Sequence, residues 1–296
     1  MIERDHRVAT GSSYVRMLAN SAALVPPLLD GLGTMKARKP IGEIYEHILA
    51  FDKAMRSNVQ RIPDFLLRES PPDGGADLPW LPLARRTLAI SAAEKIIMIH
   101  RPVLFHSFQS PAFAKTRATC IAAATTILRE HEYATAENSV SIWTHSAFCV
   151  TAAMVLGLEL FHRTDHTDDT AHRYRQMIIR AAERLRRRRS DAIGKRGAIL
   201  IDTILAAEED LVVRLMRTAR QGGSVESRQR AVINEMIGSH EIMAKFLSMT
   251  PQETSGLLLD PLTVIDPFQG AMDLESGQDF DAWFNEVFAP VYSPLL

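Results

Sequence analysis

The sequence predicts an all-α fold, built as a single large domain of about nine or ten helices. Three observations support this prediction. Apolar residues recur every three or four positions along most of the chain, as they do on a helix with one buried face. Capping residues and prolines divide the chain into segments of helical length. No stretch combines alternating apolar residues with β-branched side chains and paired turns, the pattern that a sheet requires.

The composition is typical of a soluble globular protein. Of 296 residues, 46% are hydrophobic and 23% are charged, and the formal net charge of −1 gives no overall attraction to nucleic acid or to an acidic membrane. Cys120 and Cys149 lie in apolar helical segments, so we interpret them as buried thiols in a reducing compartment. The first residues lack a signal-peptide core, and no apolar run reaches the length of a membrane span. We expect an intracellular chain, nuclear or cytoplasmic, that needs no cofactor.

The first 82 residues predict two helices and a loop. A serine pair at 12–13 can cap a first helix, which ends or kinks at Pro26. A second helix begins after Pro40 and ends at Pro63. The segment 69–82 is rich in proline and glycine, and we interpret it as a loop.

The stretch 94–163 carries most of the information in the sequence. A helix over 83–99 is apolar on most sides, which is typical of a central helix. The tripeptide His-Arg-Pro at 100–102 follows it, and we interpret this tripeptide as a helix stop because proline lacks a backbone N–H donor.

Two helices rich in small residues come next. Ser110 and Pro111 provide a cap and a first-turn proline for one of them, and Ser139 can cap the other. Alanines recur on the faces that would meet neighbouring helices, which predicts close helix–helix approach.

Three more helices are expected before residue 250. Asp168 or Thr170 can open the first, Ser190 can cap the second, and the QGGS turn at 221–224 precedes the third.

The C-terminal part of the chain differs from the rest in composition. Residues 251–296 contain eight acidic residues, no lysine or arginine, and several aromatic residues. We therefore divide the chain into a helical core of regulatory type, 1–250, and an acidic, aromatic segment, 251–296, packed on it. Its last part, 278–296, has the acidic and hydrophobic composition of a segment that binds coactivators.

Three segments carry a family resemblance. IIMIHRPVLF at 96–105 is an apolar helix followed by His-Arg-Pro and a hydrophobic residue. TRATCIAAATTIL at 116–128 has a cysteine and an alanine pair, and SIWTHSAFCVTAAMVLGLELF at 141–161 runs from a tryptophan to a Val-Leu-x-Leu pattern. Together they resemble the regulatory region of fungal zinc-cluster transcription factors, called the fungal-specific transcription factor domain. The resemblance implies an all-α regulatory fold, a nuclear location and control of RNA polymerase II transcription.

The chain departs from this family in one respect. A zinc-cluster factor carries six closely spaced cysteines that bind two zinc ions and position the DNA-reading module. With two distant cysteines, this chain is not expected to bind DNA directly. The leading hypothesis is therefore a regulatory, effector-sensing domain that controls transcription through small-molecule and protein contacts. The expected partners are a small-molecule effector, a coactivator bound through 278–296 and a second copy of the chain, with no membrane.

An enzyme on the same helical fold is the alternative hypothesis. A cyclisation or pericyclic reaction of secondary metabolism requires mainly a shaped apolar cavity and a few hydrogen-bond donors, and no metal. A scaffold that binds only proteins is a third hypothesis.

Six residues are candidates for ligand binding under either of the first two hypotheses. Arginine offers a planar fork to a carboxylate or phosphate, histidine can donate or accept, and an aromatic ring can cover an apolar ligand. The same residues lie in apolar helical segments, where packing is the more common explanation. The six candidates are His100, Arg101, His106, Trp143, His145 and Glu159.

Two further clusters have competing interpretations. Histidines and aspartates at 162–172 resemble a metal site, but a helix cap at Asp168 explains the acidic residues, and we expect no metal. Seven arginines and one lysine lie within 180–196. They suit either a nuclear import signal or a solvated helix end, where cations complement the helix dipole.

Overall fold

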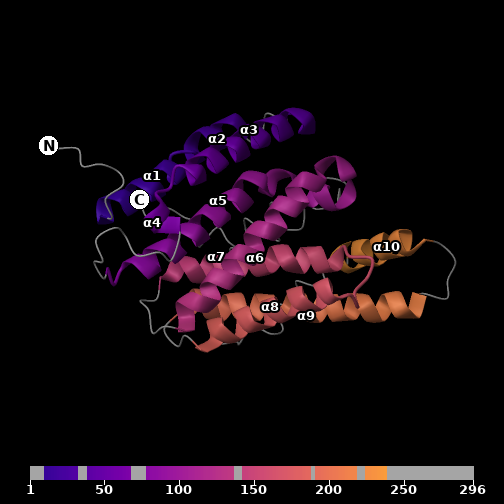
Figure 1. Cartoon of the computed structure of the whole chain (residues 1–296). Coiled ribbons are helices and arrows are strands. Elements are labelled where there is room, and N and C mark those ends of the chain that lie inside the picture. Colours follow the sequence, from indigo (N-terminus) through magenta and orange to yellow (C-terminus); the bar gives the residue numbers. More distant parts are fainter. Residues whose placement is uncertain are drawn as a thin grey trace, which may run out of the picture. The chain divides into compact units, whose positions relative to one another are not determined.

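The computed structural model describes residues 10–32, 39–67, 78–136, 142–187, 191–218 and 224–238. Within these ranges the chain forms ten α-helices and a short 3-10 helix, η1, and no strand (Figure 1). The all-α prediction is confirmed. The elements are α1 (Gly11–Ala22), α2 (Val25–Leu32), α3 (Ile41–Gln60), α4 (Asp64–Leu67), α5 (Leu81–Gln109), η1 (Pro111–Phe113), α6 (Ala114–Ala136), α7 (Trp143–Phe161), α8 (Asp169–Arg187), α9 (Ala192–Thr218) and α10 (Val225–Gly238).

The helices group into two compact units, Met1–Ser141 and Ile142–Leu296. The first unit contains α1 to α6 with η1, and the second contains α7 to α10. The boundary predicted at residue 250 stays a prediction, because 239–296 lie outside the described residues.

The helix starts of the first unit follow local sequence signals. The predicted cap at the serine pair 12–13 is wrong: Thr10 caps α1 by accepting a hydrogen bond from the Ser13 backbone N–H at 3.1 Å. Pro26 lies in the first turn of α2, where its missing N–H costs no hydrogen bond. Helix α3 begins directly after Pro40, as predicted, but it ends at Gln60 and does not reach Pro63.

Helix α5 is the longest helix of the first unit, and it continues through Pro102. The predicted helix stop at 100–102 is therefore wrong. An interior proline removes one helical hydrogen bond and costs about 3 kcal/mol. Burial in the next turn offsets this cost, because Val103 and Leu104 are 0% and 2% exposed and each such side chain contributes about 1.5–3 kcal/mol. The helix ends at Gln109, and Ser110 caps η1 through the Ala112 N–H, as predicted.

Two apolar clusters hold the first unit together around α5. One cluster joins α2 and α3 to the second half of α5 and consists of Leu28, Ile48, Met55, Ile99 and Val103. The other joins α4 and the turn before it to the first half of α5 and consists of Ile62, Phe65, Leu66, Leu81, Ala84 and Leu88. Helix α6 packs along α5 as well. Helix α5 is thus the common support of α3, α4 and α6.

Helix α7 is the core of the second unit and packs against α8 and α9. Two glycines allow the close approach of α7 and α9. A Cβ at Gly197 would lie 2.1 Å from Val150 Cγ2, and a Cβ at Gly157 would lie 2.6 Å from Ile204 Cγ2. The prediction that small residues on this helix permit close packing is confirmed.

By length and composition, α7 is the one helix in the described part of the chain that could cross a membrane. However, 89% of its apolar window is buried inside the structure, which is typical of the central helix of a globular unit. It therefore gives only weak support for a membrane span.

Aspartates cap two helices of the second unit. Asp168 accepts from the Ala171 N–H at 2.6 Å, so the predicted Asp168 cap of α8 is confirmed. Asp191 accepts from the Gly194 N–H at 2.8 Å and caps α9. The predicted caps Ser139 and Ser190 are wrong, because the N-cap of α7 is Ile142 and Asp191 caps α9.

Candidate functional site

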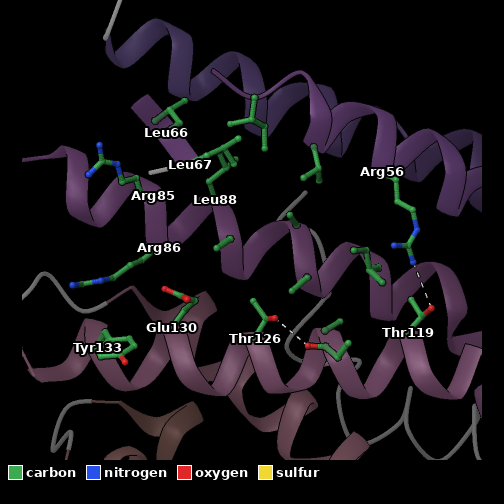
Figure 2. A pocket seen from close by; sticks show the side chains of 18 of the residues that line it. Arg56, Leu66, Leu67, Arg85, Arg86, Leu88, Thr119, Thr126, Glu130 and Tyr133 are labelled. Atoms are coloured by element: carbon green, nitrogen blue, oxygen red, sulfur yellow. Dashed lines mark hydrogen bonds between the residues drawn. The ribbon is translucent and has the colours of Figure 1, made fainter. Parts of the chain in front are cut away.

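A groove with a volume of about 1070 Å³ runs along α5 and α6 of the first unit (Figure 2). Residues of α3 and α4 complete its lining. Small-molecule sites usually occupy about 300–1,000 Å³ and are mostly apolar, so this groove has room for a large organic ligand. We therefore treat it as the candidate site.

Six of the 21 residues that line the groove are alanines. Three come from α5 and three from α6, and they are Ala89, Ala92, Ala93, Ala118, Ala122 and Ala123. The sequence pattern predicts helix contacts for such residues, and Ala93 and Ala123 are indeed buried. Ala118 and Ala122 are instead exposed, so part of the alanine pattern forms the open floor of the groove.

Polar side chains lie at the two ends of the groove. Figure 2 shows Arg56 and Thr119 at one end, and Arg85, Arg86, Glu130 and Tyr133 at the other. The charged groups of the lining are four cations, which include Lys115, and one carboxylate, Glu130, so positive charge exceeds negative charge by three. An apolar floor with a cationic surplus favours a ligand that is apolar and anionic.

The buried carboxylate of Asp52 lies next to the Arg56 end of the groove. Asp52 is 2% exposed, and Arg56 Nε donates to its two oxygens at 3.0 and 2.9 Å. Lys115 Nζ lies 3.8 Å from Asp52 Oδ2. Burial raises the pKa of Asp52, but the hydrogen bond from Arg56 and the neighbouring His100 outweigh burial and hold the pKa below its usual value. Asp52 is therefore ionised at neutral pH and positions both cations.

His100 is the second buried group of this cluster. It is fully buried, its Nδ1 lies 3.0 Å from Thr116 Oγ1, and its Nε2 lies 3.4 Å from Asp52 Oδ1. Burial lowers the pKa of His100, so the imidazole is neutral at pH 7. The cluster then carries one negative and two positive charges, a surplus of one positive charge beside the groove. Through these contacts His100 and Asp52 connect α3, α5 and α6.

Three of the six predicted ligand-binding residues lie on α5 in the first unit. None of them is part of the groove lining. His100 lies in the buried cluster, and Arg101 is half-buried. His106 is also half-buried, its ring centroid lies 6.2 Å from that of Phe113, and burial lowers its pKa.

The other three predicted residues lie on α7 in the second unit. Trp143 is 55% exposed, whereas His145 and Glu159 are buried. Glu159 pairs with Arg163 at 3.2 Å. Sixteen residues separate Trp143 from Glu159, which places them about 24 Å apart along the helix axis. The structure does not bring these three residues together in one cluster.

The groove residues Arg56, Lys115 and Thr119 are absent from the sequence-based prediction. One sequence signal was present: Asp52 and Arg56 are four residues apart, as are Lys115 and Thr119, so each pair shares one face of a helix. That signal is common on helix surfaces, and only the packing of α3 against α5 and α6 brings the two pairs together.

The histidine and aspartate cluster of the second unit forms ion pairs. Buried Glu208 meets His166 Nδ1 at 3.2 Å and Arg175 Nη2 at 2.6 Å, while Asp168 pairs with Arg163. Among the described residues, no three His, Cys, Asp or Glu side chains could hold a metal ion. Cys120 and Cys149 are buried and form no disulfide, as predicted.

The arginine cluster is described in part. Arg184, Arg186 and Arg187 lie in the last turn of α8, which fits the interpretation as a helix end, and Arg186 pairs with Asp202. Residues 188–190 lie outside the described residues, so the interpretation as an import signal stays a prediction.

Comparison with models of protein families, with curated proteins and with solved structures finds no match for this chain. The resemblance to the fungal regulatory domain therefore rests on the three sequence segments alone. The groove and its charged ends are the structural features that bear on function.

Proposed function

We propose that the chain is an effector-binding regulatory domain whose first unit takes up an amphipathic small molecule in the groove. One observation carries the proposal: a groove of about 1070 Å³ has an alanine-lined floor and polar side chains at both ends. A mostly apolar surface with a few placed polar groups is the usual composition of a small-molecule site.

The expected affinity follows from the apolar floor. A ligand that buries about 300 Å² of apolar surface gains about 7 kcal/mol at ~25 cal/mol per Å². Loss of ligand freedom opposes this gain and polar contacts at the ends add to it; where the two are equal, the gain corresponds to a dissociation constant on the order of micromolar. Affinities in this range suit a sensor that responds to changes in metabolite concentration.

The regulatory part of the proposal rests on the resemblance of segments 96–105, 116–128 and 141–161 to the fungal domain. The first two segments lie on α5 and α6, which also form the floor of the groove. A ligand in the groove contacts α3, α5 and α6 together and stabilises this arrangement by mass action. We propose that this stabilisation is the signal passed to a protein partner.

Ligand uptake can be tested with a fluorescent apolar anion of the anilinonaphthalene sulfonate type. Ala122→Trp fills the groove from an exposed position of α6, and Ala114→Trp adds the same side chain to α6 at an exposed position outside the groove. We expect micromolar binding to the wild-type protein, loss of binding in Ala122→Trp and retention in Ala114→Trp. Equal binding to all three proteins contradicts the proposal.

The regulatory role requires a separate assay. The chain is fused to an unrelated DNA-binding domain, and reporter output is measured with and without a ligand that binds the purified protein. We expect the ligand to change reporter output in the Ala114→Trp fusion and not in the Ala122→Trp fusion. A ligand that binds in vitro but leaves output unchanged in both fusions contradicts the regulatory role.

One observation favours the alternative function, an enzyme of secondary metabolism. Glu130 and Tyr133 are three residues apart on α6 and both line the groove, so an acid–base group and a phenol face the same space. Incubation of the protein with pathway intermediates tests this alternative. It predicts turnover that Glu130→Gln removes, with the fold intact by circular dichroism.

A further inference from the structure

We infer that the end of the groove formed by Arg56, Lys115 and Thr119 is a carboxylate-binding subsite, and that the ligand is a single-chain amphipath with a terminal carboxylate. This inference rests on the proposed function and specifies the chemical class of its ligand. Two cations and a hydroxyl line one end, and exposed alanines continue from them along α6.

The buried carboxylate of Asp52 fixes the Nε of Arg56, and Asp52 itself is not part of the groove lining. Arg56 Nε binds Asp52, whereas Arg56 Nη2 reaches Thr119 Oγ1 at 3.5 Å across the groove end. The Arg56 side chain is 51% exposed, so its outer N–H groups are open to a ligand. A guanidinium fixed in this way is preorganised for a second carboxylate, because arginine has five N–H donors in a planar fork.

Charge balance supports an anion at this end. Asp52 contributes one negative charge and the side chains of Arg56 and Lys115 two positive charges, while buried His100 is neutral. A single carboxylate therefore neutralises the end. Asp52 itself is 2% exposed and is not part of the lining, so Arg56 and Lys115 stand between it and an incoming anion.

The opposite end is less suited to an anion. Arg85 Nε donates to the backbone carbonyl of Phe65 at 2.7 Å. Arg85, Arg86 and Glu130 give this end a surplus of one positive charge as well, so net charge alone does not distinguish the two ends. The difference is that the carboxylate of Glu130 lies in the lining itself, where it repels a carboxylate, although Arg129 Nη2 lies 3.4 Å from Glu130 Oε1. Hence the anionic head group belongs at the Arg56 end, and the tail of the ligand points toward Tyr133.

The apolar floor sets the shape of the remainder of the ligand. Along α6 the distance from Thr119 to Glu130 is eleven residues, or about 16 Å. Ala122 lies between them and presents a short side chain to the groove, and Thr126 also belongs to this stretch of the lining. A linear alkyl chain fits a floor of this length that is lined by short side chains, so fatty acids of medium chain length are the appropriate probes.

The test compares three twelve-carbon probes that differ in the head group: dodecanoate, dodecanol and dodecyltrimethylammonium. Dissociation constants are measured by displacement of the fluorescent probe, with all ligands below their micelle concentrations. We expect dodecanoate to bind about tenfold more tightly than dodecanol, because a charge-assisted hydrogen bond replaces a neutral one. The ammonium is expected to bind more weakly than the alcohol.

Three Lys or Arg to Met variants locate the head group. Lys115→Met removes one cation of the subsite, and Lys53→Met removes an exposed lysine of α3 that does not line the groove. Arg86→Met removes a cation of the opposite end. We expect Lys115→Met to weaken dodecanoate binding about fivefold to tenfold and to leave dodecanol unchanged. Lys53→Met and Arg86→Met are expected to leave the preference for dodecanoate intact.

The outcomes separate this inference from the proposed function. Equal affinities for dodecanoate and dodecanol, or a preference that disappears in Arg86→Met and persists in Lys115→Met, overturn the subsite but leave ligand uptake in place. If none of the three probes displaces the fluorescent anion, the subsite fails but ligand uptake stands; if the fluorescent anion itself does not bind, or binds equally to Ala122→Trp, the proposed function fails as well. Circular dichroism checks that each variant is folded, which is expected because the Lys115 side chain is 59% exposed.

Discussion

Arg56 donates its Nε–H to both oxygens of Asp52, at 3.0 and 2.9 Å, although Asp52 is 2% exposed and the Arg56 side chain is 51% exposed. This pair connects the interior of the first unit to the groove. The buried partner fixes the exposed one, so the charge offered to a ligand has a fixed position. The Asp52–Arg56 ion pair also contributes to the free energy of unfolding of the first unit, so substitutions in the pair change both ligand binding and stability.

Asp52→Asn is expected to lower the free energy of unfolding by about 1–3 kcal/mol. Breaking a buried ion pair costs about 3–5 kcal/mol, and the exposure of Arg56 reduces that figure. Urea denaturation measures the change, with Glu46→Gln, an exposed acid of α3, as the control.

The effect of Asp52→Asn depends on pH. The pKa of Asp52 is lowered in the folded state. The contribution of ionised Asp52 to the free energy of unfolding is therefore complete above the pKa that Asp52 has in the unfolded chain, and it is lost as pH falls through the pKa in the folded state. The unfolding free energies of wild type and variant therefore converge below about pH 4. A constant difference down to strongly acidic pH contradicts this account.

His100 gives a second pH dependence at milder pH. Because burial lowers its folded-state pKa, the unfolded state binds more protons below about pH 6.5. Stability then falls as pH falls from 6.5, with a slope of at most about 1.4 kcal/mol per pH unit for one group. His106, whose pKa is also lowered by burial, adds to the same trend.

His100→Asn is expected to reduce that slope between pH 6.5 and 5, and His172→Asn, at an exposed position of α8, is expected to leave it unchanged. Unfolding free energies at several pH values measure the slope. Identical slopes in wild type and His100→Asn would show that His100 does not titrate with unfolding.

Pro102→Ala is expected to stabilise the protein by about 2–3 kcal/mol. Alanine restores the missing helical hydrogen bond, worth about 3 kcal/mol with the relieved clash, and the added freedom of the unfolded chain takes back up to about 1 kcal/mol. Pro111→Ala, at the start of η1, is the control and is expected to be neutral or slightly destabilising. Destabilisation by Pro102→Ala would mean that α5 needs the proline.

Gly197→Ala tests the close packing of α7 against α9. The new Cβ would lie 2.1 Å from Val150 Cγ2, so we expect a loss of about 1–3 kcal/mol. Val150→Ala in the same chain is expected to restore part of the loss, and a double-mutant cycle measures the coupling. Gly42→Ala meets no atom within 4 Å and is expected to be neutral or stabilising.

Local signals made much of the fold predictable, while the site depended on packing. The caps at Ser110 and Asp168 are confirmed because a cap uses atoms of its own segment. The helix stop at Pro102 is wrong because burial of the next turn outweighs a local penalty.

The groove also depends on helix packing that the sequence does not reveal. Ala122 and Ala123 are neighbours with identical side chains, yet one is exposed in the groove and the other is buried. Sequence alone does not distinguish an alanine in a helix contact from one on an open floor. Likewise, Lys115 joins Arg56 only through the packing of three helices.

Hydrogen–deuterium exchange with and without dodecanoate tests the central claim most directly, because it reports which helices a ligand stabilises. We expect slower exchange in the groove-lining turns of α5 and α6, around 88–96 and 115–123, and unchanged exchange in α8 and α9. Protection confined to the helices of the second unit, or no protection at saturating ligand, would contradict the central claim.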